Sequence, residues 1–189
     1  MSPGDLKIDW EIMSEPRVNE LLAIALEVLE EEGLENLGVG TISRRAGIKP
    51  PSLYKQFESK ADIERQLADL GFNLWATELA AASDALPETA TRYDHITAIA
   101  LAYRRMGLEH PQLFRLMNLR PFLGVELMRA VGQITKIDYA ALFPNMTVSM
   151  SFWSWGHGIL VLESADRFPP DADTDDMWKL MIDSIHAIA

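Results

Sequence analysis

The side chains best suited to binding a polyanion are gathered in one short segment, Thr41–Lys60. Against a single acid, Glu58, this segment carries five bases: Arg44, Arg45, Lys49, Lys55 and Lys60. The 189-residue chain as a whole has a formal net charge of −11, and such a charge repels phosphate groups at long range. The composition therefore argues against non-specific binding to nucleic acid or to an anionic membrane. Any polyanion contact is expected to be confined to this segment.

Metal, redox and catalytic chemistry find little support in the residue pattern. The chain has no cysteine, and no two of its four histidines stand three or four residues apart, as a helical metal clamp requires. We therefore expect neither a metal nor a cofactor. His157 with Ser154 or Glu163 could suggest acid–base catalysis, but no nucleophile, base and orienting group stand at readable spacing. We expect the chain not to be an enzyme.

A mostly apolar stretch, residues 145–165, places one polar side chain in a stripe of large ones. His157 recurs at helical spacing with methionine, tryptophan and leucine, and apolar walls with a few polar groups are usual in small-molecule pockets. The predicted pocket residues are Tyr103, Met106, Phe114, Met117, Asn118, Phe122, Met150, Trp153 and His157. The alternative is structural, because such stripes also form ordinary cores and His157 could be a hydrogen-bonded core histidine.

The elements that position these residues are predicted to be helices throughout. Apolar residues recur at helical spacing, and no convincing period-two alternation occurs. The expected helices cover residues 14–32, two short pieces within 38–57, 59–82, one ending near 110, a short one from 111, 145–165 and 173–188. The helix over 145–165 is apolar almost all round, so we expect it to be buried on several sides, in its own domain or against another chain.

The first three helices, with a tight turn between the second and third, predict a helix-turn-helix. Gly47 can adopt the backbone conformation of a sharp turn, and Pro50 and Pro51 can begin a helix because first-turn amides lack intrahelical partners. The predicted DNA contacts are Thr41, Arg44, Lys49, Pro50, Pro51, Ser52, Tyr54, Lys55, Gln56 and Lys60. The alternative is an ordinary packing corner with a solvated charged face.

The same residues carry a resemblance to a known family. The segment 41–63 resembles the N-terminal DNA-binding segment of the TetR family of bacterial repressors, and the resemblance covers about residues 18–70. The matching positions are Ile42, Ala46, Gly47, Ile48, Leu53, Tyr54, Phe57, Ser59 and Lys60. The chain departs from the family pattern at Ser43, where a small alanine is usual, and at Gly38 and Gly40. Gly38 is still an acceptable helix cap, whereas Gly40 offers no side chain to a phosphate.

A shorter resemblance concerns the C-terminal half. Residues 110–117 and 152–168 resemble a ligand-domain subgroup of the family named for a Trp-His-Gly signature. The signature positions are taken by Trp153, His157, Gly158, Leu162 and Phe168.

The resemblance implies a homodimeric repressor that binds a pseudo-palindromic operator in double-stranded DNA and is released by a small, largely apolar effector. It implies a DNA-binding domain over residues 1–60, with an N-terminal arm over 1–13, and a ligand-binding and dimerisation domain over 61–189. The two C-terminal helices would pair with those of a second subunit. Since no signal-like start and no run of 18 apolar residues occurs, we expect a cytoplasmic protein without a membrane segment. The rival hypothesis is a small helical enzyme or small-molecule carrier that uses the C-terminal cavity.

Overall fold

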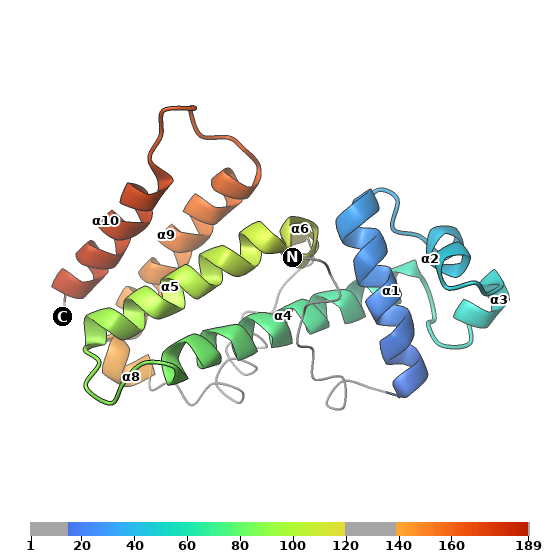
Figure 1. Ribbon diagram of the computed structural model, residues 1–189, viewed down its shortest axis with the longest axis horizontal. Coiled ribbons are helices and arrows are strands. Elements are labelled where there is room, and N and C mark those ends of the chain that lie inside the picture. The colour runs from blue at the N-terminus through green and yellow to red at the C-terminus, as the bar shows by residue number, and fades with distance from the viewer. Residues whose placement is uncertain (1–14, 120–138, 189) are drawn as a thin grey trace. The chain divides into compact units, whose positions relative to one another are not determined.

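A computed structural model describes residues 15–119 and 139–188, and every regular element in these residues is a helix (Figure 1). This confirms the predicted all-α class. The helices are α1 (Pro16–Glu32), α2 (Val39–Arg45), α3 (Pro50–Leu53), α4 (Lys60–Asp84), α5 (Arg92–Glu109), α6 (Pro111–Leu119), α8 (Tyr139–Leu142), α9 (Met146–Ser164) and α10 (Thr174–Ala187). The predicted arm over residues 1–13, the first residue of the helix predicted over 14–32 and the predicted contact Phe122 lie outside the described residues.

The chain forms two compact units, and each takes in more than one stretch of sequence. The first unit comprises residues 1–74 and 110–127, and the second comprises residues 75–109 and 128–189. Helix α4 therefore contributes residues to both. The functional boundary predicted between residues 60 and 61 stays a prediction, because a compact unit need not coincide with a functional domain.

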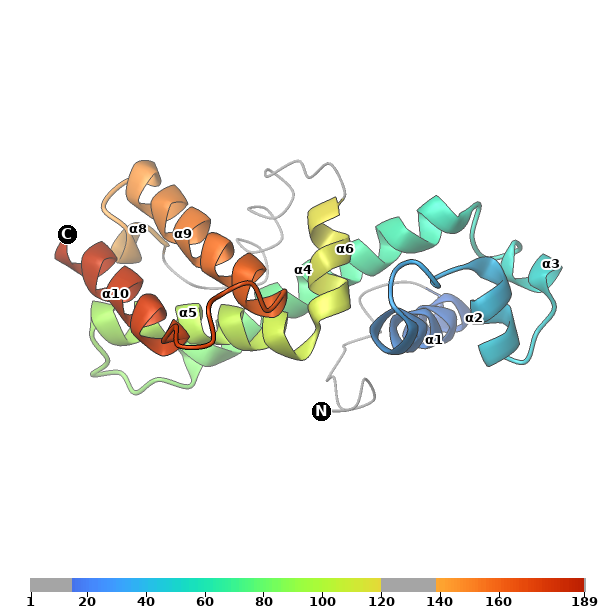
Figure 2. The same cartoon turned by 90° about the horizontal axis from the view of Figure 1, so that it is seen from above.

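The first unit is built around α1, which packs against α2 and α6. Pro16 begins this helix, where its missing N–H costs nothing, and Gly33 ends it with φ of 83°. The apolar face of α1 is buried, with Leu21, Leu22 and Leu29 at most 1% exposed. Helices α1, α2 and α3 lie together in the views of Figures 1 and 2.

The second unit is a layer of α5, α9 and α10, each of which packs against the other two (Figures 1 and 2). Two glycines permit close approach. A Cβ at Gly107 of α5 would lie 2.5 Å from Leu160 of α9, and a Cβ at Gly156 of α9 would lie 3.2 Å from the Trp178 ring of α10. Leu160 and Trp178 are at most 1% exposed, so these crossings form the centre of the core.

Against the residues that the structure describes, helix α9 is buried on one face. Its buried residues include Val148, Phe152 and Ile159, whereas Met150 is 48% exposed and Trp155 is 39% exposed. Cover of its other faces, by its own domain or by another chain, stays a prediction. Among the described residues, no helix is long and apolar enough to cross a membrane.

Candidate functional site

The turn between α2 and α3 is fixed by main-chain hydrogen bonds. The amide of Ile48 donates to the carbonyl of Ser43 over 3.0 Å, and the amide of Gly47 donates to the carbonyl of Arg44 over 3.3 Å. This pair of bonds is a Schellman motif, which requires a left-handed residue just after the helix. Gly47 supplies it with φ of 66°. The structure thus confirms the reason for the glycine that the sequence suggested.

Helix α3 begins as predicted and is short. Lys49 is its N-cap residue and Pro50 and Pro51 form its first turn, while the amide of Ser52 donates to the carbonyl of Lys49 over 2.8 Å. Leu53 is 1% exposed and packs inward. The other three residues of this single helix turn, Pro50, Pro51 and Ser52, are exposed.

The predicted DNA contacts form an exposed surface in the first unit. Thr41 is half-buried and the other nine are exposed: Arg44, Lys49, Pro50, Pro51, Ser52, Tyr54, Lys55, Gln56 and Lys60. Tyr54 is 56% exposed although it is a large aromatic residue. Lys49 and Lys55 make no ion pair with any part of the chain that the structure describes. Their charges are therefore available to a partner.

The start of α4 fixes the position of Lys60, another of the predicted DNA contacts. The Asp62 amide donates to the Ser59 hydroxyl over 3.1 Å, and the Glu58 amide donates to the Asp62 carboxylate over the same distance. The first bond is the N-cap half of a capping box, whereas the second joins Asp62 to the residue before the cap instead of to Ser59 itself. These bonds fix Lys60 in the first turn of α4, where its ammonium lies 3.6 Å from Glu64.

The two adjacent arginines of α2 differ in their surroundings. Arg44 has a side chain that is 74% exposed and lies 3.9 Å from Glu32. Arg45 hydrogen-bonds to Glu31 over 2.7 Å and to Glu32 over 2.9 Å. The sequence grouped both as members of one basic segment, whereas the structure assigns Arg45 to contacts within the first unit.

Among the predicted ligand contacts, three come together in the second unit. The Tyr103 hydroxyl and the Nδ1 atom of His157 are 2.8 Å apart, and the Trp153 ring stands edge-on to the Tyr103 ring at 5.3 Å. Burial raises the pKa of the Tyr103 hydroxyl and lowers the pKa of the His157 imidazole. Both shifts favour the neutral forms near pH 7, so this is an uncharged hydrogen-bonding pair in aromatic surroundings.

The remaining predicted ligand contacts are dispersed over the two units. Met106 is 2% exposed in the second unit, and Met150 of the same unit is directed to solvent. Phe114, Met117 and Asn118 belong to the first unit. The Asn118 amide donates to the carbonyl of Phe114 over 2.9 Å.

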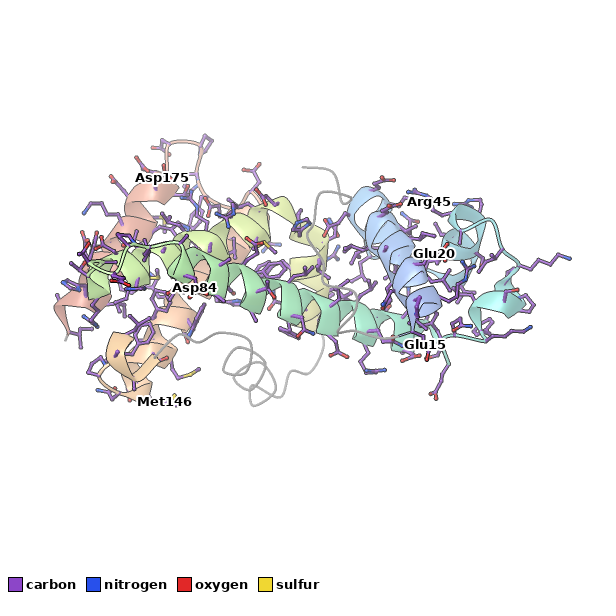
Figure 3. The ribbon with its side chains drawn as sticks, turned by 60° about the horizontal axis from the view of Figure 1, so that its bottom comes forward. Glu15, Glu20, Arg45, Asp84, Met146 and Asp175 are labelled. Carbon is purple, nitrogen blue, oxygen red and sulfur yellow. The ribbon has the colours of Figure 1, made fainter. Side chains whose placement is uncertain are left out.

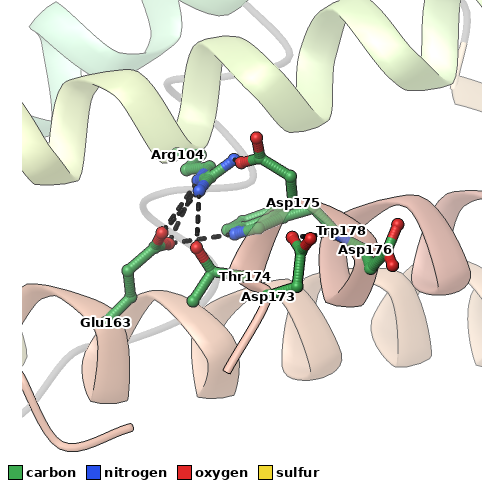
Figure 4. Close-up of polar contacts among 7 residues, drawn as sticks. All are labelled: Arg104, Glu163, Asp173, Thr174, Asp175, Asp176 and Trp178. Atoms are coloured by element: carbon green, nitrogen blue, oxygen red, sulfur yellow. Dashed lines mark hydrogen bonds and ion pairs between the residues drawn. The ribbon is translucent and has the colours of Figure 1, made fainter. Parts of the chain in front are cut away.

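A network of polar contacts centred on Arg104 was not anticipated from the sequence (Figure 4). Arg104 of α5 hydrogen-bonds to Glu163 of α9 over 2.6 Å and to Thr174 over 2.9 Å, and it pairs with Asp175 over 2.5 Å. The Trp178 indole donates to Glu163 over 3.0 Å. Burial alone would raise the pKa of the Glu163 carboxyl, but hydrogen bonds from Arg104, Trp178 and Thr174 hold it below its ordinary value.

This network bears on the acid–base alternative. Glu163 accepts hydrogen bonds from Arg104 and Trp178, and His157 is paired with Tyr103. The structure therefore does not bring Glu163 and His157 together as a catalytic pair. No group of three potential ligands that could hold a metal ion occurs among the residues described.

Two family models match the chain. One, described as bacterial regulatory proteins of the tetR family, matches residues 21–67, and the other, described as a tetracyclin repressor-like C-terminal domain, matches residues 96–185. An HTH-type transcriptional regulator of Mycobacterium tuberculosis is 25% identical over 172 residues, which are 84% of this chain and 74% of that protein.

Solved structures show the same fold. A protein of unknown function from Rhodococcus sp. RHA1 has a TM-score of 0.72 at 21% identity, and the match covers 94% of this chain and 97% of that one. A TetR variant from Acinetobacter baumannii AYE, in complex with minocycline, has a TM-score of 0.59 at 20% identity over 89% of this chain and 90% of that one. At these identities the likeness concerns the fold alone.

Proposed function

The chain belongs to the TetR family of bacterial transcription regulators, and from this membership we propose that it is a cytoplasmic repressor released from its operator by a small effector. It binds a pseudo-palindromic operator as a homodimer, and the effector is largely apolar. One observation carries the proposal. The exposed residues around α3 include two cations, Lys49 and Lys55, that the described part of the chain leaves unpaired.

In the proposed complex, some of the exposed residues contact phosphates and others contact bases. Tyr54 and Lys60 bind phosphate oxygens and fix the docking, whereas Lys49 and Gln56 reach base edges and select the sequence. Lys60 lies in the first turn of α4, where the helix N-terminus adds to the attraction for an anion. Phosphate contacts displace counterions, so affinity should fall steeply with salt.

Dimerisation is proposed through the exposed faces of α9 and α10. Residues 146–162 include no charged side chain, and the exposed apolar residues of the two helices are Met146, Met150, Trp155, Val161, Leu162, Leu180 and Ile188. A two-fold interface must be complementary to itself, which an uncharged apolar face satisfies. Such a dimer would hold its two recognition helices about 34–36 Å apart, the spacing of successive major-groove sites.

The effector is proposed to bind beside Tyr103, Trp153 and His157, because an uncharged polar pair in aromatic surroundings suits an apolar molecule with one or two polar atoms. The Acinetobacter relative that was solved with minocycline shares this fold. An effector that prefers one of two conformations of the dimer would shift the equilibrium by its difference in affinity for them. The operator would be released if the preferred conformation docks poorly.

DNA selection tests the proposal. The full chain is used to select duplexes from random DNA, and affinity for the selected duplex is measured by fluorescence anisotropy at several salt concentrations. Tyr54→Phe and Lys60→Gln should weaken binding to all duplexes alike by roughly tenfold each, whereas Gln56→Ala should change the preferred sequence. Arg105→Gln removes a cation of α5 in the second unit that is paired with Glu78 and lies outside the proposed dimer face, so it serves as a control and should leave affinity unchanged. Failure to select any duplex would contradict the proposal.

Sedimentation tests the dimer separately. Leu162→Glu places a charge on the exposed face of α9 and should shift the protein from dimer to monomer. Leu101 of α5 is also exposed, at 46% against 39% for Leu162, but it lies outside the proposed interface. Leu101→Glu should therefore leave the dimer intact, and equal dissociation by both variants would contradict the assignment of the face.

The rival function is a small-molecule carrier or enzyme that uses the second unit. It would need no exposed basic surface around α3, and the pairing of Glu163 with Arg104 removes one of its catalytic candidates. A protein that binds a small molecule tightly but selects no duplex would favour the carrier.

A further inference from the structure

The basic surface of the first unit lies next to an acidic helix end. Five glutamates occur between residues 27 and 35: Glu27, Glu30, Glu31, Glu32 and Glu35. Unpaired carboxylates so close to α2 would repel the phosphates that the proposed function requires. The question is what compensates for these charges.

Each of these carboxylates has a partner within the first unit. Glu30 accepts hydrogen bonds from the amides of Gln112 and Leu113 at the start of α6, and Glu35 pairs with Arg115 over 2.7 Å. The other three surround one guanidinium. Arg45 lies 2.7 Å from Glu31, 2.9 Å from Glu32 and 4.0 Å from Glu27.

Arg45, labelled in Figure 3, is directed toward α1, where its guanidinium meets Glu31. Its side chain is 31% exposed, against 74% for Arg44. The hydrogen bond to Glu31 is the main reason that the pKa of the Arg45 guanidinium lies above its ordinary value. A guanidinium held by two carboxylates has its fork of donors occupied and is poorly placed to bind a phosphate.

The contact also fixes the orientation of the recognition helix. Arg45 is the last residue of α2, and the Schellman turn over Ala46–Ile48 begins directly after it. Because main-chain bonds hold that turn, an anchor at the end of α2 constrains where α3 begins. The ion pairs with α1 are such an anchor.

We propose that Arg45 is a positioning residue for DNA binding, which joins the end of α2 to α1 and offsets part of the negative charge at the acidic end of α1 beside the proposed DNA surface. It acts without touching the DNA. The inference rests on the proposed function, since it concerns the same surface. It separates two adjacent arginines that look equivalent in the sequence.

Charge reversal tests the proposal, with anisotropy measured on the duplex that the natural chain selects. Arg45→Glu should weaken binding by roughly a hundredfold, because it removes the anchor and adds repulsion. Arg45→Glu combined with Glu31→Arg restores the pair in reverse and should recover at least about tenfold of that loss. The matched control combines Arg45→Glu with Asp84→Arg, which restores the same net charge at the exposed end of α4, in the second unit. It should recover less than about threefold.

The salt dependence separates positioning from direct contact. Arg44→Gln should reduce the slope of log affinity against log salt by about 0.9, as the loss of one phosphate contact does. Arg45→Gln should weaken binding with a smaller reduction of the slope, because it removes no phosphate contact and only exposes carboxylates whose repulsion salt screens. An equal reduction of the slope by both variants, or equal recovery by the two charge-reversal pairs, would overturn the proposal.

A measurement without DNA keeps the inference distinct from the proposed function. Amide hydrogen exchange at Ala46 and Ile48, which close the end of α2 and the turn, should be accelerated at least about threefold by Arg45→Glu and slowed again by adding Glu31→Arg. Exchange at Ile63 in α4 serves as the reference. Unchanged exchange at the turn would overturn the proposal, whereas failure of the natural chain to select a duplex would count against the proposed function alone.

Discussion

Two arginines join helices in the two units, and they do so in different surroundings. Arg45 of the first unit meets its glutamates at the surface, with side chains between 31% and 52% exposed for the pairs under 3 Å. Arg104 of the second unit is 16% exposed, and its partner Glu163 is 11% exposed. Water competes for the first set of charges and is largely excluded from the second.

This difference in the exposure of the ion pairs predicts how each unit responds to substitutions. Exposed pairs contribute little to stability, whereas removal of one member of a buried pair leaves a charge without a partner. We therefore expect substitutions in the second unit to act on folding. Substitutions around α2 and α3 should act mainly on orientation and binding.

The largest effect is expected at Glu163. Glu163→Ala removes the buried carboxylate partner of Arg104, which keeps only Thr174 and the exposed Asp175, and leaves the indole of Trp178 without its acceptor. It should lower the free energy of unfolding by about 3 kcal/mol. Urea unfolding followed by tryptophan fluorescence measures it. Asp175 also pairs with Arg104 but its side chain is 83% exposed, so Asp175→Asn should cost at most about 1 kcal/mol. Equal losses from both variants would break the comparison.

A smaller effect is expected at the turn of the first unit. Gly47 has φ of 66°, and an added Cβ there meets no atom within 4 Å. Gly47→Ala should therefore cost only the strain of the left-handed backbone, about 1–2 kcal/mol. We expect a matching loss of DNA affinity, because the turn sets the start of α3. A variant with natural stability and natural affinity would show that the turn does not depend on this conformation.

A glycine in the neighbouring helix should respond in the opposite direction. Gly40 lies inside α2 with an ordinary helical backbone, and an added Cβ meets no atom within 4 Å. Gly40→Ala should raise the free energy of unfolding by up to about 1 kcal/mol, because alanine loses less backbone entropy in a helix. Thermal unfolding beside Gly47→Ala tests both signs at once, and a loss at both positions would be unexpected.

The smallest expected effect is on how the free energy of unfolding depends on pH. Glu30 is a half-buried acid of the first unit, and burial raises its pKa above the ordinary 4.5 although two backbone amides oppose the shift. The folded state then holds the proton more tightly than the unfolded state, so this contribution to stability is present below pH 4.5 and lost as pH rises through the raised pKa. Glu30→Gln should remove this fall in the free energy of unfolding with rising pH, because glutamine does not titrate. Unfolding curves of both proteins between about pH 4 and 7 that run parallel would contradict it.

Features set by neighbouring residues were predictable from the sequence. Gly33, Gly47 and the prolines at 50 and 51 act within a few residues of themselves, so the helix ends they produce were expected and are confirmed. The same holds for Asp173, whose side chain caps α10 by accepting from the Asp176 amide. Caps and turns depend on local backbone geometry, and one sequence contains all of it.

Features set by distant residues were not predictable. Arg104 and Glu163 stand 59 positions apart, and no spacing rule connects them. Arg44 and Arg45 are the same residue type in adjacent positions, so only the placement of α1 distinguishes them. The uniform apolarity of α9 carries no periodic signal, and its buried and exposed faces therefore could not be assigned.

The main-chain bonds of the α2–α3 turn also bear on how far such a sequence can diverge. The amides and carbonyls that close the turn belong to Ser43, Arg44, Gly47 and Ile48, yet of these only the glycine is required for its residue type. Side chains around the turn can be exchanged during evolution without altering the angle between the two helices. Under the proposed function, a change of exposed side chains alone can therefore change the DNA sequence that is recognised, while the α2–α3 turn that positions them stays the same.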